Sequence, residues 1–378
     1  IVVAGLTFNG ANNDFAVLRY TDAGALDASF NLTGKATIGI GTHDTAFSVA
    51  LAGDGRILVS GMATMNAGID FAVVRLHANG TPDTSFGVDG EALMGVASVS
   101  GARGMAVAPD GSIALAGTVA GDFAVGRLLP SGLQDLAFGG GSVVRTDFEA
   151  WPAAEWRAVA RLADGKVLAA GYASVAGTYD VAIARFHADG TPDADFGCDA
   201  PGACSGIAIT PIGTSTDYAN GMAIQPDGRI VVAGRMADGA YEAAFVARFL
   251  ANGLPDTSFN LTGVFRTSGA KYDVLNALAL QPDVRIVAVG HDNAPASVPK
   301  FLVLRLTADG TPDASFNATG TVVMPMGGLY ASLTAVAVQA DGAIVAGGTA
   351  YGGGGNRDFA LLRLTPAGVP DAMFGTAG

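Results

Sequence analysis

The chain has 378 residues, half of them hydrophobic, so it carries enough apolar surface to fold around a core. Its formal net charge is −13 with only 21 Lys and Arg residues, and this balance argues against binding to a nucleic-acid backbone. No apolar run approaches the roughly 18 residues of a membrane-spanning helix, and no signal-like stretch opens the sequence. These features favour a soluble chain from which any leader has been removed.

A twelve-residue pattern, R-x4-G-x2-D-x2-F, organises the whole chain, and we call it the anchor. Its seven copies keep the same internal spacing and occupy residues 19–30, 75–86, 127–138, 185–196, 248–259, 305–316 and 363–374. Successive copies lie 52 to 63 residues apart, so the length variation falls outside the anchor, where loops tolerate it. Residues 1–378 are therefore expected to form a single repeat domain.

A second element, Asp-Gly followed by a short apolar run, precedes the anchor. Six copies begin at Asp54, Asp110, Asp164, Asp227, Asp283 and Asp341, and Ile1–Gly5 matches the tail of a seventh. In the second repeat we expect strands at 47–52, 56–61, 70–76 and 91–96. Asp-Gly and Asn-Gly between apolar runs favour tight hairpins, so each repeat is predicted to be a four-stranded antiparallel meander.

Strands such as 15–18 and 230–233 are apolar on both faces, which indicates that both faces are covered. Radially stacked four-stranded blades provide such cover, so we predict an all-β propeller with seven blades. An open β-solenoid is the alternative, but its repeats are usually shorter and lack regular Asp-Gly hairpins.

The two terminal repeats are each one strand short. The first lacks the strand before its Asp-Gly turn, and the last ends at Gly378 before its fourth strand. These ends do not complement each other in one blade, so we expect this chain to be part of a longer one.

The Arg and Asp of the anchor flank a turn and are predicted to form an ion pair. The pairs are Arg19 with Asp27, Arg75 with Asp83, Arg127 with Asp135, Arg185 with Asp193, Arg248 with Asp256, Arg305 with Asp313, and Arg363 with Asp371. A catalytic role would require seven equivalent active sites, so the prediction is structural. The anchor Phe is expected to fill the core.

The anchor, together with A-I-Q-P-D-G-R-I-V-V-A-G at 223–234, resembles the bacterial delta-60 repeat family over nearly the whole chain. The resemblance implies a tandem-repeat, propeller-like protein that is secreted or displayed on a bacterial surface, and it implies no established catalytic residues. Two departures are Val284, where the turn glycine is expected, and a cysteine-bearing loop after Phe196.

Cys198 and Cys204 lie in one short loop containing Gly and Pro and are predicted to form a local disulfide. Two reduced thiols are the alternative, and a metal site would need more ligands than the loop offers. A disulfide would favour an extracellular or cell-envelope location.

The positions that differ between repeats are the candidates for function. Ten residues before the turn Asp, three repeats carry Asp44, Asp217 and Asp273, which could hold Ca²⁺ if they gather. The favoured alternative is that each Asp caps the turn leading into its strand. No other cofactor is expected.

Trp151, Glu155 and Trp156 form the only Trp-bearing segment, and exposed aromatic rings beside a carboxylate suit a sugar or protein contact. Core packing explains these rings equally well. His43-Asp44 and His291-Asp292 are adjacent pairs whose side chains would point to opposite faces of a strand, which gives catalysis little support.

Three functions remain open from the sequence. The first is a non-catalytic secreted or surface propeller that binds a protein or carbohydrate partner or serves a structural role. The second is a secreted hydrolase or lyase with its site at the channel mouth. The third is self-assembly through unpaired strand edges.

Overall fold

The computed structural model describes residues 1–66, 68–98, 100–146, 154–200, 202–269, 271–294, 297–326, 330–351, 356–376 and 378. Within these residues the regular structure is β, apart from the short 3₁₀ turns η1 (Gly139–Gly141) and η2 (Phe259–Leu261). The described residues contain no helix of the length and hydropathy that a membrane crossing requires.

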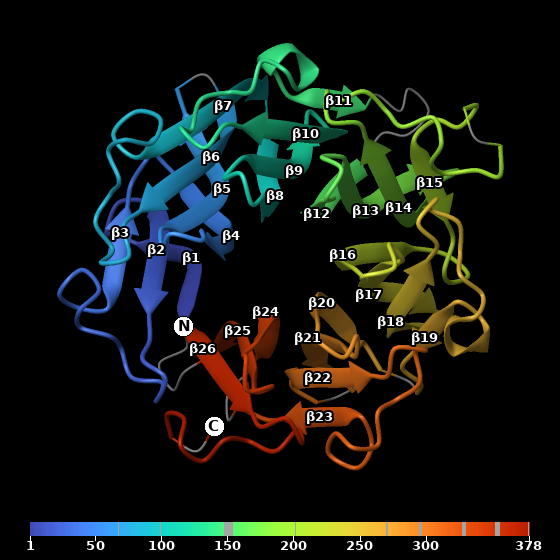
Figure 1. Ribbon diagram of the computed structural model, residues 1–378. Helices are drawn as coiled ribbons and strands as arrows, with labels where there is room; N and C mark the ends of the chain where they lie inside the picture. Colours follow the sequence, from blue (N-terminus) through green and yellow to red (C-terminus); the bar gives the residue numbers. More distant parts are fainter. Residues whose placement is uncertain are drawn as a thin grey trace. The chain divides into compact units, whose positions relative to one another are not determined.

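The strands form seven sheets over the described residues (Figure 1). The first three contain β1 (Val2–Phe8), β2 (Asn13–Arg19) and β3 (Lys35–Ile38); β4 (Asp44–Leu51), β5 (Ile57–Met65), β6 (Gly68–Leu76) and β7 (Glu91–Ser98); and β8 (Ser100–Val107), β9 (Ile113–Val119), β10 (Asp122–Leu128) and β11 (Val144–Thr146). The fourth and fifth contain β12 (Ala154–Arg161), β13 (Val167–Val175), β14 (Thr178–Phe186) and β15 (Ile207–Thr210); and β16 (Asp217–Ile224), β17 (Ile230–Asp238), β18 (Tyr241–Phe249) and β19 (Val264–Arg266). The last two contain β20 (Val274–Leu280), β21 (Ile286–Asp292), β22 (Lys300–Leu306) and β23 (Thr321–Met324); and β24 (Ala331–Val338), β25 (Ile344–Tyr351) and β26 (Arg357–Leu364).

Each sheet follows chain order as an antiparallel meander, as the Asp-Gly and Asn-Gly turns predict. Five sheets in the described part of the chain have four strands, and the first and last have three. The sheets are the blades of an all-β, seven-bladed β-propeller, so the predicted fold class is confirmed. Val284 takes φ +68°, the conformation of the glycine that it replaces, so the hairpin survives the substitution.

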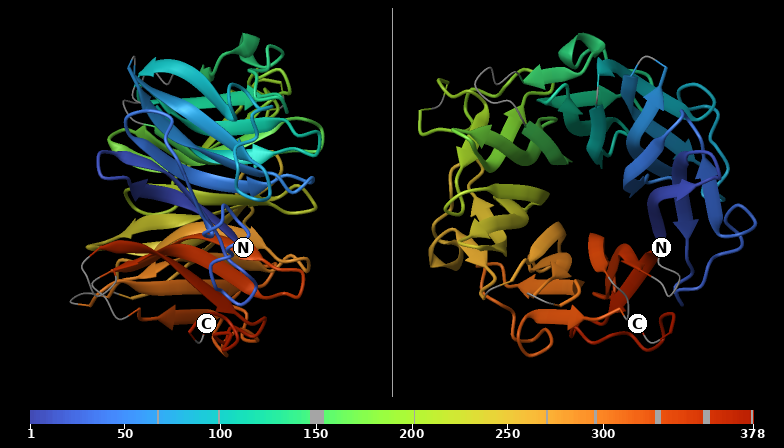
Figure 2. Two further views of the ribbon diagram at one scale, coloured as in Figure 1. Left: turned by 90° about the vertical axis from the view of Figure 1, so that its left-hand side faces the viewer. Right: turned by 180° about the vertical axis from the view of Figure 1, so that it is seen from behind.

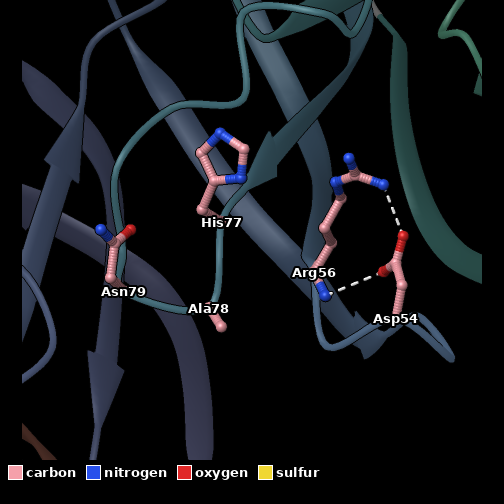
Figure 3. Close-up of a pocket in the computed structure, with 5 residues that line it drawn as sticks. All are labelled: Asp54, Arg56, His77, Ala78 and Asn79. Atoms are coloured by element: carbon pink, nitrogen blue, oxygen red, sulfur yellow. Dashed lines mark hydrogen bonds and ion pairs between the residues drawn. The ribbon is translucent and has the colours of Figure 1, made fainter.

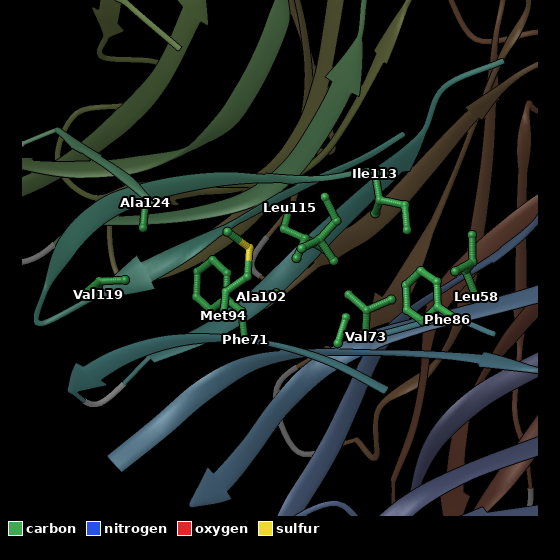
Figure 4. Packing of buried hydrophobic residues seen from close by; sticks show 12 residues of the cluster. Leu58, Phe71, Val73, Phe86, Met94, Ala102, Ile113, Leu115, Val119 and Ala124 are labelled. Carbon is green, nitrogen blue, oxygen red and sulfur yellow. The ribbon is translucent and has the colours of Figure 1, made fainter. Parts of the chain in front are cut away.

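The chain divides into two compact units, Ile1–Ala169 with Arg185–Asp193, and Ala170–Ala184 with Ala194–Gly378. Within each unit, successive sheets lie side by side in the views of Figure 2. The sheets of β4–β7 and β8–β11, for example, enclose a core that includes Phe71, Phe86, Met94 and Leu115 (Figure 4). Neighbouring sheets therefore cover each other's apolar faces, which explains why single strands are apolar on both sides.

All seven predicted anchor ion pairs are present, with Arg Nε or Nη2 within 2.6–2.8 Å of the Asp Oδ2. The anchor Asp also accepts hydrogen bonds from the residue two positions later, as Asp83 does from the amide and hydroxyl of Ser85. Burial alone would raise the pKa of Asp83. The bonds from Ser85 and Arg75 outweigh burial and hold that pKa at about 2.

The anchor also joins one repeat to the next, a role the sequence pattern does not reveal. Arg75, Arg127, Arg248 and Arg305 each donate Nη1 to a turn carbonyl of the following repeat at 2.5–2.6 Å. Arg19 makes the same bond to Ala78. The anchor Phe packs under the turn glycine of the following repeat, as Phe259 does under Gly310. We call this arrangement the inter-repeat clamp.

A second cation reaches the anchor Asp in four repeats and was not predicted. This cation is the residue that follows the turn between the first and second strands. Its nitrogen lies 2.8–3.0 Å from the anchor carboxylate in the pairs Arg56–Asp83, Lys166–Asp193, Arg229–Asp256 and Arg285–Asp313. The third and seventh repeats carry Ser112 and Ala343 at this position, and their clamps lack that second cation.

The predicted disulfide joins Cys198 and Cys204. The amides of Gly202 and Cys204 both donate to the carbonyl of Ala194, which ties the loop back to the fourth anchor. The disulfide therefore closes a small loop beside a clamp rather than linking two sheets.

Candidate binding site

The two ends of the sheets differ in chemistry. The anchors and the Asp-Gly turns lie at one end of each sheet. The hairpin that joins the second strand to the third lies at the opposite end, which we call the hairpin end. Of the eight tyrosines in the chain, seven lie at the hairpin end within the second unit. These are Tyr172, Tyr179, Tyr218, Tyr241, Tyr272, Tyr330 and Tyr351, and we call them the tyrosine row.

The first cluster of the row joins the fourth and fifth sheets. Tyr172 on β13 and Tyr179 on β14 contact Tyr218 on β16, with ring centroids 4.6 and 5.4 Å from it. The guanidinium of Arg235 lies 4.4 Å from the Tyr218 ring and pairs with Glu242 at 3.1 Å. Each ring is partly exposed, so the cluster is a rigid aromatic surface bordered by a paired charge.

A second cluster lies one sheet further along the chain. Tyr241 on β18 and Tyr272, two residues before β20, have ring centroids 5.5 Å apart. Beside them Lys271 forms an ion pair with Asp292 at the end of β21. Tyr272 is 39 % exposed and is the most open ring of the pair.

A third cluster follows at the last two sheets. Tyr330 lies between His291 and Tyr351, with centroids 6.0 and 6.4 Å from its own. The guanidinium of Arg357 stands over both tyrosines, at 5.1 and 5.5 Å. The row thus repeats one composition, tyrosines with a cation, at three successive sheet junctions.

Buried titratable groups underlie the row. Burial raises the pKa of Asp217, although the amides of Gly213 and Ile212 donate to its Oδ2. Burial and the charge of Asp292 raise the pKa of Asp273. Burial, and then the charge of Arg235, lower the pKa of His291, whose Nδ1 lies 3.1 Å from the hydroxyl of Ser332. These groups form hydrogen bonds with turns and strands beneath the rings.

Asp217→Asn is expected to raise the free energy of unfolding by about 1 kcal/mol at pH 7. Oδ1 of Asp217 is buried and meets no hydrogen-bond donor among the described residues, so the ionised carboxylate carries an uncompensated burial cost. Because its pKa is higher in the folded state, the native carboxyl protonates first as pH falls. The wild-type protein therefore gains stability towards pH 4 and the advantage of the variant shrinks, which denaturant unfolding at several pH values measures.

Asp44→Asn is the matched control, because both oxygens of Asp44 already accept backbone amides from Ile40 and Gly41. This variant should gain nothing at pH 7. Equal gains from both substitutions would contradict the account of Asp217.

The carboxylates proposed for Ca²⁺ act as turn acceptors. Asp44 and Asp217 each bind two backbone amides of the preceding turn, and Asp273 accepts one from Asn293 at 3.4 Å. Among the described residues, no group of three or more His, Cys, Asp or Glu side chains is placed to hold a metal ion. The alternative that each Asp caps the turn leading into its strand describes Asp44 and Asp217, whereas Asp273 accepts its bond from the residue after β21.

Of the two alternatives for Trp156, an exposed contact and core packing, the structure supports core packing. Trp156 is 0 % exposed and stacks on Phe123 with centroids 3.6 Å apart, because alternation along β12 turns it inward. Glu155 pairs with Arg103 at 2.6 Å and with Arg157 at 3.1 Å. Trp151 lies outside the described residues. The predicted aromatic contact at this segment is therefore core packing for Trp156.

An open depression of about 530 Å³ lies at the anchor end of the first unit, lined by Asp54, Arg56, His77, Ala78 and Asn79 (Figure 3). Arg56 bridges Asp54 and the anchor Asp83, and His77 Nε2 lies 3.9 Å from Asp83. The polar groups that line the depression already form the ion pairs of an inter-repeat clamp. We therefore assign the depression to the repeat architecture and not to a binding site.

The family model that matches this chain matches it repeat by repeat. The family model described as "Domain of unknown function (DUF5122) beta-propeller" matches residues 1–30, 52–86, 162–196, 225–259, 281–316 and 339–374. The chain belongs to this family. The matched segments carry the anchors of six repeats of the DUF5122 β-propeller, and the third anchor lies outside them. No curated protein matches the chain.

Two solved structures resemble this DUF5122 propeller. A Dyadobacter fermentans protein of unknown function is 15 % identical with a TM-score of 0.50, over 84 % of this chain and 93 % of the other. The polysaccharide lyase Uly1 is 12 % identical with a TM-score of 0.52, over 96 % of this chain and 87 % of the other. At such identities the likeness shows the fold alone.

The tyrosine row was missed from the sequence, although a signal was present. No tyrosine occurs between Tyr20 and Tyr172, and seven occur from Tyr172 onwards. Two of them, Tyr218 and Tyr272, are the direct neighbours of Asp217 and Asp273, which the alignment of repeats had singled out.

Proposed function

We propose that this protein is a non-catalytic binding module of an extracellular or cell-envelope compartment and that it binds its ligand through the tyrosine row. The observation that carries the proposal is the concentration of partly exposed tyrosines at one end of one unit. Tyrosine combines a large apolar face with a polar tip and is enriched at binding surfaces for that reason.

The row departs from the repeat, which separates it from the shared architecture. The anchor recurs in every repeat and fixes the fold, whereas the tyrosine positions carry other residues in the first unit. Gly171 and Gly234 are followed by Tyr172 and Arg235, but the equivalent Gly61 and Gly117 are followed by Met62 and Thr118. Tyrosines that occur in some repeats and not in others support a binding role rather than a role in the shared fold.

The disulfide supports the compartment. Disulfides persist in oxidising surroundings and are rare in reducing ones, so the bond between Cys198 and Cys204 fits a secreted or envelope protein.

A secreted hydrolase or lyase is the second candidate, favoured by the carboxylates with raised pKa beneath the row. Asp217 is 0 % exposed and Asp273 is 3 % exposed, so neither carboxyl reaches a bound substrate without rearrangement. General acid–base catalysis requires hydrogen-bond contact with the reacting group. The geometry therefore supports binding over turnover.

The test uses a panel of neutral and acidic soluble polysaccharides and a phage-displayed peptide library. We expect retention of at least one ligand class by the wild-type protein, loss of it in the double variant Tyr218→Ala/Tyr330→Ala, and retention in Tyr20→Ala. Reducing-end and unsaturated-product assays should stay at background. Accumulating products, or equal binding by the double variant, would refute the proposal.

A further inference from the structure

The tyrosine row is periodic, which constrains its ligand. The three clusters occur at successive sheet junctions, and each combines partly exposed rings with a cation: Arg235, Lys271 or Arg357. A small molecule would contact one cluster. A ligand that uses all three must itself be an extended polymer whose units recur, since weak contacts at linked sites add through effective concentration.

Two of the three cations of the row are paired with carboxylates. Arg235 pairs with Glu242, and Lys271 pairs with Asp292, so these cations bring no net positive charge. Arg357 places its guanidinium on two rings and donates Nε to the hydroxyl of Tyr351 at 3.3 Å. An acidic polymer would meet carboxylates beside each of the first two cations, so the electrostatics favour a neutral one.

The strands that carry three of the rings offer no edge to which a peptide strand could be added. Tyr172, Tyr241 and Tyr351 lie on β13, β18 and β25, each of which is paired with a strand on both sides. Strand addition needs an unpaired edge, which these strands do not offer. Side-chain anchors need deep pockets, whereas the rings here stand against one another as a surface.

Sugar rings suit this surface. The apolar C–H face of a pyranose packs on an aromatic ring by dispersion, and its hydroxyls accept from and donate to fixed polar groups at the ring border. Ion-paired side chains such as Arg235 and Glu242 supply both donors and acceptors without favouring a charge. Packing among the tyrosines restricts their rotamers before binding, which lowers the entropic cost.

We propose that the tyrosine row binds an extended neutral polysaccharide, with one short stretch of the glycan at each of the three clusters. The inference rests on the proposed function. It adds the class of ligand and the expectation that affinity depends on the length of the glycan.

The test is isothermal titration with length-fractionated oligosaccharides of mixed-linkage β-glucan, galactomannan and dextran, with alginate and polygalacturonate as acidic comparators. For at least one neutral glycan, affinity should rise with chain length until three clusters are spanned. Tyr218→Ala, Tyr272→Ala and Tyr330→Ala should each weaken binding of the long chain about fivefold to tenfold. Tyr20→Ala should leave it within about twofold, since Tyr20 lies outside the row and the variant keeps every aromatic face of the row.

Thermal melts of every variant separate lost binding from lost folding. Tighter binding of the acidic glycans, or a loss confined to one cluster and independent of chain length, would overturn the inference. If a peptide binds and the row variants weaken that binding, the assignment of a glycan ligand is wrong and the proposed function still holds. If no ligand responds to any row variant, both fail.

Discussion

Asp313→Ala should lower the free energy of unfolding by about 3–5 kcal/mol, measured by denaturant titration. Asp313 and Arg305 are 7 % and 5 % exposed at the side chain, and Arg285 adds a second cation at 2.9 Å. Removing the carboxylate leaves the buried guanidinium of Arg305 without its ion-pair partner, whereas Arg285, 40 % exposed at the side chain, keeps its pair with Asp283. The hydroxyl and amide of Ser315 lose their acceptor as well.

The seventh repeat supplies a matched control. Asp371 pairs with Arg363, is 22 % exposed, and belongs to a repeat that carries Ala343 in place of the second cation. Asp371→Ala should therefore cost much less stability than Asp313→Ala, as for a partly solvated pair. Equal losses in the two variants would show that burial and the second cation do not determine the strength of the clamp.

Gly310→Ala is expected to destabilise the fold by about 3 kcal/mol, from two separate causes. Gly310 has φ +90°, a conformation that costs an L-residue energy. A Cβ there would also lie 2.6 Å from the ring of Phe259, which is fully buried and unable to move aside. Thermal and denaturant unfolding of the variant measure the sum.

Gly228→Ala separates the two causes, because Gly228 has φ +84° but only an ordinary 3.4 Å contact in the place of the new methyl group. This control should lose about 1 kcal/mol through backbone strain alone. If the loss at Gly310 did not exceed that at Gly228, the ring contact would have no part in holding adjacent repeats together.

The sequence predicted what recurs within one repeat. The invariant eight-residue spacing of Arg and Asp is local, so a turn brings the pair together whatever surrounds it, and all seven pairs follow. The contact of Phe259 with Gly310 could not be read in the same way, because the two residues belong to different copies. Spacing within a pattern carries no information about which copy supplies the partner.

The candidate site was harder to predict than the fold. The sequence left Trp156 open between a surface contact and the core, and the structure favours the core, because strand alternation begins at Ala154 and turns the indole inward. Tyr218, Tyr272 and Tyr330 each lie next to the position ten residues before the turn Asp, but no pattern of residues at that position indicates that their rings gather with those of neighbouring strands. Their juxtaposition depends on how successive sheets pack, which only the structure supplies.

The inter-repeat clamp bears on how such a chain can lengthen or shorten. At each junction one repeat supplies the Phe and the next supplies the turn glycine above it, so the interface is asymmetric, as in a head-to-tail polymer. Duplicating one whole repeat reproduces both halves of such a junction. An insertion of half a period would instead leave one Phe with no glycine above it.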